Sequence, residues 1–233
     1  MKRVLLLFIV SIFTFHSKGQ VSMGLRSGYT AADLEMTGKT GSNLDGDHTT
    51  FHGWHLDLVI NVPVYEGLYF QPVIRYITKG TNYNAERPVK PELSGAYLPA
   101  GSRLQLNYLE LPLNFVYKFT LPGGKITAGL GPYIATGLRG RYHYDIVQNG
   151  RNVSNDSKEV QFSREANDNL AVVRMNPWDA GANFAVGFEF NNGIMLGANY
   201  SRGMTDADKN DLTTSRNRYF AVSVGFLFNR EDY

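Results

Sequence analysis

Every second residue is bulky and apolar in a series of short runs between Phe51 and Phe228. In one run, apolar positions alternate with polar or smaller ones as Trp54, His55, Leu56, Asp57, Leu58, Val59, Ile60, Asn61 and Val62. Because side chains of a strand alternate between its two faces, each run has one apolar face. The opposite face carries Gly, Tyr, Asn and opposed charges, which suits a narrow lumen better than the exterior of a soluble sandwich. The alternation therefore predicts barrel strands with an apolar outer surface.

The first nineteen residues resemble a secretory leader. Lys2 and Arg3 precede a twelve-residue apolar run over 4–15, and Ser17-Lys18-Gly19 forms a small-x-small cleavage site before Gln20. The run is too short to cross a bilayer as a helix. We therefore expect a signal peptide over 1–19 and a single outer-membrane β-barrel domain over 20–233, in the bacterial cell outer membrane.

Charge and cysteine content exclude several classes of function. Without the leader the chain has 20 basic and 21 acidic residues, and it contains no cysteine. Binding of nucleic acid needs clustered basic residues, so we expect no nucleic-acid partner. Thiol chemistry and disulfides are also excluded. No later segment has the eighteen continuous apolar residues of a spanning helix, which leaves the closed barrel as the way to cross a membrane.

The predicted fold is all-β, an eight-stranded antiparallel transmembrane up-and-down barrel. We expect its strands over 21–29, 51–63, 68–79, 108–119, 126–141, 179–190, 194–201 and 219–228. An even number returns both termini to one side, as in bacterial barrels. Prolines 72, 112 and 132 fall within strands and remove a donor each, so we expect bulges or bends there.

The connections alternate between short and long, which orients the barrel. Short turns at 65–67, 121–124 and 191–193 contain Gly, and the long segments 31–50, 81–103, 145–178 and 205–217 are polar. Since short turns face the periplasm in such barrels, the four long loops should be extracellular. The alternating run 170–175 suggests an extension of the sixth strand, whose edge would suit a partner strand.

Two neighbouring segments have a distinctive sequence: Tyr108-Leu-Glu-Leu-Pro-Leu-Asn-Phe-Val-Tyr-Lys-Phe119 and Gly129-Leu-Gly-Pro-Tyr-Ile-Ala-Thr-Gly-Leu-Arg-Gly-Arg141. Together they resemble the PorT-type outer-membrane β-barrel family of Bacteroidetes. The resemblance extends over the whole chain after the leader. It implies a small barrel inserted by the barrel-assembly machinery. It implies fold and location more directly than function, because most members have no defined activity.

The inward faces of the predicted strands carry nine charged residues. An eight-stranded barrel leaves an interior that side chains fill, so opposed charges there must pair. We therefore predict a lumen plugged by a charge network, formed by Arg26, Asp57, Arg75, Lys79, Glu110, Arg139, Arg141, Asp179 and Glu189. The alternative is that these residues line a narrow path for ions or solutes.

Other candidate sites have weaker patterns. Residues 206–211 resemble the start of a calcium loop but have Asp211 at the turn-glycine position. Histidines 48, 52 and 55 cluster, although positions 52 and 55 fall on opposite faces of a strand. A lipid-modifying enzyme could use His52 or His143 as a base and Ser102 or Ser201 as a nucleophile, but no motif joins them. We expect no catalytic residue, cofactor or metal.

Four interpretations of function therefore remain. The first is a non-enzymatic structural or surface-interaction barrel with a plugged lumen, acting through its extracellular loops. The alternatives are a small porin-like channel, a component of a secretion or gliding assembly, and a lipid-modifying enzyme. The expected partners are outer-membrane lipid, lipopolysaccharide whose phosphates could meet Arg103 or Arg202, the barrel-assembly machinery during insertion, and a protein at the loops.

Overall fold

The computed structural model describes residues 20–38, 48–83, 102–148, 151–163, 174–207 and 213–228. The predicted signal peptide at 1–19 lies outside them. The described residues form ten strands: β1 (Ser22–Gly38), β2 (His48–Tyr65), β3 (Leu68–Tyr83), β4 (Arg103–Leu121), β5 (Gly124–Gln148), β6 (Arg151–Phe162), β7 (Arg174–Met175), β8 (Trp178–Phe190), β9 (Ile194–Gly203) and β10 (Thr213–Phe228). No helix in the described part of the chain is long and apolar enough to cross a membrane.

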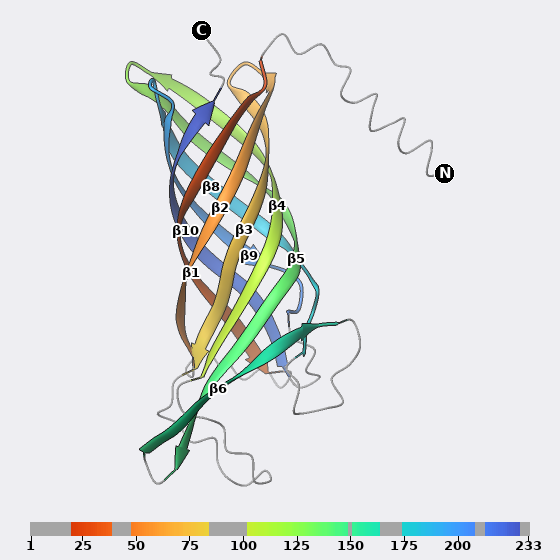
Figure 1. Cartoon of the computed structure of the whole chain (residues 1–233). Coiled ribbons are helices and arrows are strands. Elements are labelled where there is room, and N and C mark those ends of the chain that lie inside the picture. The colour runs from red at the N-terminus through yellow and green to blue at the C-terminus, as the bar shows by residue number, and fades with distance from the viewer. Residues whose placement is uncertain are drawn as a thin grey trace, which may run out of the picture.

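Eight of these strands close into an antiparallel barrel, which confirms the predicted fold. Each pairs with its neighbours in the order β1, β2, β3, β4, β5, β8, β9, β10, and β10 pairs back onto β1 from Met23↔Phe228 to Gly38↔Thr213. Figure 1 shows the strands tilted around one closed wall, with the start of β1 and the end of β10 at the same end of the barrel. Closure leaves no free sheet edge in the wall, as a strand-built structure in lipid requires.

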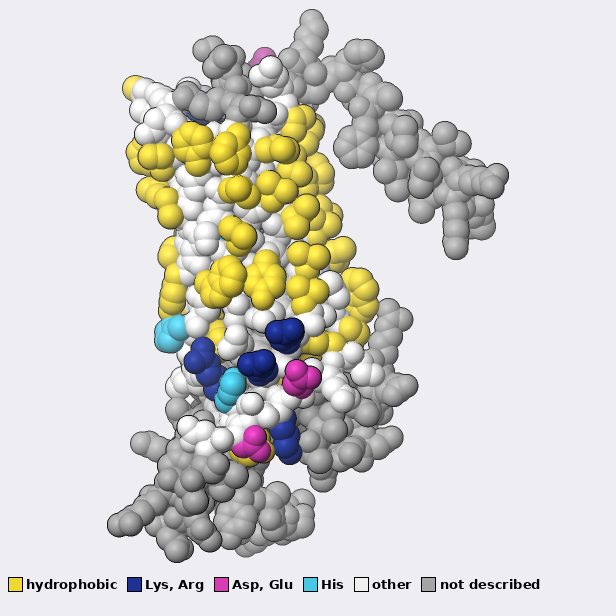
Figure 2. All heavy atoms as spheres, viewed as in Figure 1, with side chains coloured by type: hydrophobic (Ala, Val, Ile, Leu, Met, Phe, Trp, Pro, Cys, Tyr) yellow, Lys and Arg dark blue, Asp and Glu magenta, His cyan; other side chains and the backbone are white. Residues whose placement is uncertain are grey.

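The wall has the two faces that the alternation predicts. Apolar side chains on its outside are exposed, among them Leu130 at 61%, Val186 at 60% and Phe184 at 54%. Side chains on the inside are buried, from Asn61 at one end of β2 to Phe51 at the other. Figure 2 shows the apolar side chains spread over the wall and ending where Lys, Arg and His side chains begin, toward the end with the long loops. The outer surface therefore suits lipid.

Short turns join the strands at one end of the barrel. Glu66-Gly67, Pro122-Gly123 and Asn191-Asn192 connect the pairs, and Gly67 and Gly193 adopt φ values of 71° and 91° that favour glycine. Because short turns face the periplasm in bacterial barrels, the opposite end is extracellular.

The strands extend further at the extracellular end than we predicted. β1 and β10 remain paired from Ala31↔Phe220 to Gly38↔Thr213, so residues 31–38 and 213–217 form strands where loops were predicted at 31–50 and 205–217. β5 has 25 residues, and a spanning strand needs only about 10. Its last part, from Gly140 to Gln148, pairs with β6, and beyond His143, where the pairing with β4 ends, the two strands continue as a hairpin. Figure 1 shows this hairpin projecting from the long-loop end.

The expected extension of the sixth strand is wrong for the part that the structure describes, which forms the separate strand β7. Arg174 and Met175 pair with Gln161 and Phe162 of β6 in parallel, so they do not continue the antiparallel strand β8. Residues 164–173, which contain the rest of the predicted run, lie outside the described residues.

The bulges also differ from the prediction. The register passes Pro72, Pro112 and Pro132 without a shift. Within the wall, shifts occur instead between Thr50 and His55, between Pro63 and Tyr65, and at Gly137–Arg139, where Asn107 pairs with Arg139 but Tyr108 pairs with Gly137. Two of these three intervals contain a glycine, Gly53 and Gly137, and glycine tolerates the backbone of a bulge.

The two faces of the wall give a direct test by substitution. Phe184→Arg places a charge among lipid-facing residues, between Leu130 of β5 and Tyr200 of β9, and should reduce the free energy of assembly by about 2 to 4 kcal/mol. Asp156→Arg on the exposed hairpin strand β6 should leave assembly unchanged. Heat-modifiable gel migration after refolding into lipid measures the folded fraction, and equal yields for the two variants would contradict the face assignment.

Candidate functional site in the closed lumen

Asp57 and Arg75 form the centre of the charge network in the lumen. They are register partners on β2 and β3, so their side chains enter the lumen side by side. Arg75 donates from Nε and from a terminal nitrogen to the two oxygens of Asp57, at 2.7 and 2.8 Å. Arg26, the register partner of Asp57 on β1, donates its Nε at 2.7 Å. The carboxylate is thus held between two guanidinium groups.

A second ion pair continues the network toward the extracellular end. The ammonium nitrogen of Lys79 on β3 lies 2.6 Å from Glu110 of β4 and 3.4 Å from Asp179 of β8. Glu110 lies 3.5 Å from Arg75, which links the two parts. Three cations and three carboxylates therefore form one connected group, and its formal charge is zero.

Tyrosines and an amide add hydrogen bonds to these charges. The Tyr219 hydroxyl donates to Glu110 and accepts a hydrogen bond from Arg75 at 2.7 Å. Tyr133 and Asn217 donate to Asp179 at 3.2 and 2.9 Å. The Lys79 ammonium also lies 4.8 to 5.2 Å from the ring centroids of Tyr108, Tyr133 and Tyr219.

This arrangement makes burial of the charges tolerable. Arg75, Lys79, Asp57 and Glu110 are at most 1% exposed. An isolated ion would lose several kcal/mol of hydration there, whereas paired ions with satisfied hydrogen bonds recover most of that loss. Aromatic faces around the ammonium add a cation–π contribution. The interior of the barrel at this level is filled by mutually neutralising side chains.

An apolar cluster closes the lumen on the extracellular side of the network. Its fourteen buried members come from the barrel strands and from the covering segments: Ala32, Leu34, Phe51, Ile77, Leu104, Leu106, Tyr108, Tyr133, Ala135, Val160, Met175, Ala207, Tyr219 and Ala221. The Phe162 ring packs edge-on against the Tyr108 ring at 5.7 Å. Backbone bonds from Ser163 to Met175 and from Asn176 to Ala207 hold these covering segments together. Buried apolar and aromatic side chains therefore occupy the lumen at this level.

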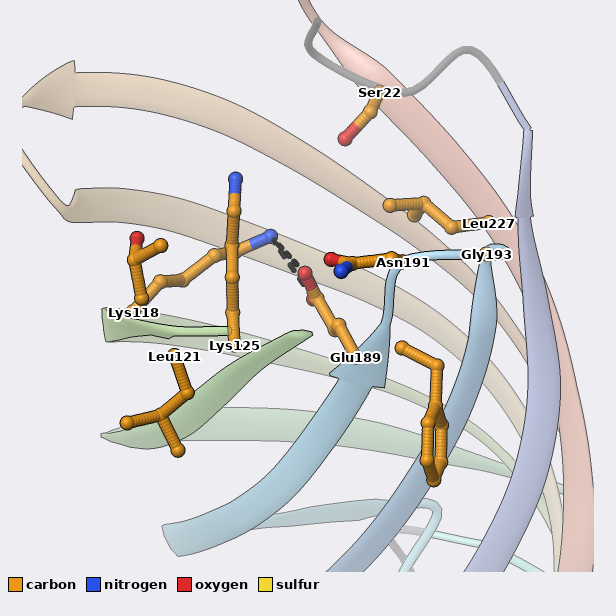
Figure 3. Close-up of a pocket in the computed structure, with 10 residues that line it drawn as sticks. Ser22, Lys118, Leu121, Lys125, Glu189, Asn191, Gly193 and Leu227 are labelled. Carbon is orange, nitrogen blue, oxygen red and sulfur yellow. Dashed lines mark hydrogen bonds and ion pairs between the residues drawn. The ribbon is translucent and has the colours of Figure 1, made fainter. Parts of the chain in front are cut away.

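The periplasmic end has an open hollow of about 300 Å³. It is lined by Ser22, Lys118, Thr120, Leu121, Lys125, Glu189, Phe190, Asn191, Gly193 and Leu227. Figure 3 shows Lys118 reaching across this hollow to Glu189, where the two groups lie 2.8 Å apart. The Lys118 ammonium also lies 4.4 Å from the Tyr69 ring centroid. The hollow is a vestibule below the filled part of the lumen.

The structure brings together six of the nine predicted lumen charges. Arg26, Asp57, Arg75, Lys79, Glu110 and Asp179 form the connected network. Glu189 is paired separately with Lys118, a residue the sequence analysis missed. Lys118 lies eight positions after Glu110, on the same face of β4, so extending the alternation by four further pairs would have identified it.

Arg139 and Arg141 were wrongly assigned to the lumen. The bulge at Gly137–Arg139 inserts one residue, so that Gly140 faces inward next to Val160 and Leu106. Arg139 and Arg141 are exposed and lie on the outer face of β5. A one-residue shift exchanges the faces of all later residues in a strand.

The other candidate residues are not assembled into one site. His55 is buried inside, 3.0 Å from the Thr30 hydroxyl, whereas His52 is exposed and hydrogen-bonded to Tyr29. Ser201 donates to Asn183 within the lumen, away from His52 on the outer wall. In the predicted calcium loop, Asp206 accepts a hydrogen bond from the backbone N–H of Ser215. Residues 208–211 of that loop lie outside the described residues.

The closed wall with an apolar exterior and a charge-filled interior defines an eight-stranded outer-membrane β-barrel. A family model described as the outer membrane protein beta-barrel domain matches residues 15–209, and the chain belongs to this family. The family places the protein in the bacterial outer membrane.

Solved structures of similar fold share little sequence with this chain. Neisserial surface protein A has 12% identity and a TM-score of 0.43, with 90% of this chain and 99% of that chain covered. OprG from Pseudomonas aeruginosa has 9% identity and a TM-score of 0.44, with 91% and 98% covered. Ail, the attachment invasion locus protein of Yersinia pestis, has 13% identity and a TM-score of 0.38, with 90% and 99% covered. A search of curated proteins gave no match.

Loss of the central ammonium should destabilise the barrel strongly. Lys79→Met removes the cation beside Asp179 and leaves Glu110 with only the more distant Arg75 in a buried site, so the free energy of unfolding should fall by about 3 to 5 kcal/mol. Lys158→Met on the exposed hairpin is the matched control and should change it by less than about 0.5 kcal/mol. Urea unfolding in lipid vesicles measures both values. Similar values for the two variants would show that the network does not hold the lumen together.

Proposed function

We propose that this protein is a non-enzymatic outer-membrane barrel with a plugged lumen that acts as a structural or surface-interaction protein through its extracellular side. The buried, neutral network around Arg75 and Lys79 carries this proposal, because side chains occupy the space that a solute would need. The apolar cluster above the network adds a second barrier. An ion would have to separate several buried ion pairs and then cross an apolar layer, and each step is costly.

The β5–β6 hairpin supports a role in surface contact. Tyr142 and Tyr144 stack with ring centroids 5.8 Å apart, and Lys158 lies over the Tyr144 ring at 5.8 Å. Tyr144 donates to Asp156 at 2.8 Å, which holds the pKa of that carboxyl below its usual range and raises the pKa of the phenol. Cross-strand pairs of this kind give the hairpin a defined shape outside the membrane. A shaped polar and aromatic surface suits contact with another protein.

Two strands of the wall support a narrower family assignment. The segments 108–119 and 129–141 that resemble the PorT type form β4 and the main part of β5, which contribute Glu110 and Tyr133 to the lumen. We infer a PorT-type barrel, inserted by the barrel-assembly machinery and contacting outer-membrane lipid along its wall. Membership of a larger secretion or gliding assembly would use the same extracellular surface.

Planar-bilayer recordings test the plugged lumen. The refolded mature chain, with barrel closure verified by heat-modifiable gel migration, should produce no conductance steps at 100 mV. At this voltage, the energy for moving one elementary charge across the membrane is about 2.3 kcal/mol. A folded sample that gives reproducible steps would replace this proposal with a channel. Lys79→Met, in the folded fraction that remains, should conduct more than the parent because the loss of the ammonium leaves the site negatively charged, which favours entry of cations.

Photochemical crosslinking tests the contact surface. A p-benzoylphenylalanine in place of Ser157, which is exposed on β6, should give a discrete protein adduct in intact cells. The same group in place of Val186 faces lipid and should give none. Absence of a protein adduct at Ser157, with the folded barrel present at the cell surface, would assign the protein a structural role alone.

A further inference from the structure

The outer wall has a hollow of about 200 Å³ where β4 and β5 approach the extracellular end. Its lining combines two guanidinium groups, an imidazole and two amides, from Gln105, Asn107, Arg139, Gly140, Arg141 and His143. We propose that this outer-wall hollow binds a phosphate group of an outer-leaflet glycolipid, with the two arginines on the phosphate and Asn107 on the sugar that carries it. The inference depends on the location of the barrel in the outer membrane and is independent of whether the lumen conducts.

The bulge in β5 creates the hollow. It turns Arg139 and Arg141 outward, opposite their register partners Asn107 and Gln105 on β4. Residues two apart on a strand lie about 7 Å apart, so the two guanidinium groups can reach one phosphate from neighbouring positions. Planar guanidinium groups bind phosphate oxygens in pairs, which suits Arg better than Lys for this task.

The position of the hollow matches the headgroup layer of the membrane. On the same outer face, Ile134, Leu138 and Leu109 are 50%, 53% and 43% exposed, so lipid-facing residues continue up to the bulge. Trp178 lies beside Thr136, and tryptophan is enriched at the interface between chains and headgroups. Arg139 follows Leu138 directly. A lipid whose acyl chains lie on the apolar wall would therefore place its headgroup at the two arginines.

The two arginines have unused hydrogen-bonding capacity. Among the residues that the structure describes, neither Arg139 nor Arg141 forms an ion pair. By contrast, the two arginines that the sequence suggested for phosphate are engaged. Arg202 is paired with Glu35 at 2.8 Å, and Arg103 lies 4.6 Å from the centre of the Phe51 ring. Two cations at neighbouring positions repel each other. Glu159, the register partner of Arg141 on β6, offsets part of this charge, and a phosphate between the two arginines would neutralise the rest.

An orphaned acceptor indicates more than a bare phosphate. The side-chain oxygen of Asn107 is buried and has no hydrogen-bond partner among the described residues. Such an oxygen requires a donor, which phosphate dianion does not offer. The hydroxyl or amide group of a phosphorylated amino sugar would supply it. The combination of cations and acceptor thus favours the phosphorylated sugar of a glycolipid over a simple anion.

Native mass spectrometry with detergent-purified protein and defined lipids provides the test. The parent should retain bisphosphorylated lipid A, and Arg139→Gln/Arg141→Gln should bind it at least about tenfold more weakly, since one charged hydrogen bond contributes roughly that factor. Lipid A without phosphates should bind the parent as weakly as the double variant binds the phosphorylated lipid. This second comparison uses the parent alone, so it holds even if the variant folds poorly.

Arg202→Gln/Arg216→Gln removes the same charge from the rim outside the hollow, and it should bind lipid A like the parent. An equal loss in this control would show a general basic collar instead of a site. Glucosamine 1-phosphate should compete only at millimolar concentration, because it lacks the acyl chains. If it displaced lipid A at equal concentration, the hollow would belong to a soluble sugar phosphate, and the lipid assignment would be overturned. Equal binding of lipid A with and without phosphates would overturn the proposal altogether.

Discussion

The hydrogen-bonded contact between β1 and β10 is the interaction on which the rest of this structure depends. Backbone groups in lipid have no water to pair with, so a sheet must close or leave an unpaired edge. Closure with eight strands fixes a narrow interior, and the interior then dictates which side chains it can contain. The filled lumen, the short turns on one side and the projecting strands on the other all follow from that ring of paired backbones.

Because the closed interior is narrow, the charges inside it must neutralise one another. Asp57 forms ion pairs with two arginines, and Lys79 forms ion pairs with Glu110 and Asp179. Six charges from β1, β2, β3, β4 and β8 therefore neutralise one another. Each pair joins strands that are neighbours in the wall or that face each other across the lumen. The network therefore stabilises a particular cross-section of the barrel as well as its own charges. Removal of its cations would leave the same carboxylates buried and unpaired.

Alternation predicted most of this fold because a strand in a barrel wall has only two environments. It identified all eight wall strands and the inward positions of Arg26, Asp57, Arg75, Lys79, Glu110 and Asp179, whose pairing the structure confirms. It could not predict the bulge before Gly140, because one inserted residue leaves no mark in the pattern of either half of β5. Extension of β1 and β10 beyond the bilayer was equally hidden, since polar paired strands and polar loops have similar composition.

That bulge has consequences on both sides of the wall. On the inside it places Gly140, whose missing side chain leaves room for Val160 and Leu106, so β6 can pack over the mouth and bring Phe162 onto Tyr108. On the outside the same residue shift presents Arg139 and Arg141 at the level where the apolar wall ends. A continuous alternation would have placed both arginines in the lumen without carboxylates to pair with, since the six inner charges are already balanced. One irregular position thus keeps these two positive charges out of the lumen and places them on the outer face, where the apolar wall ends.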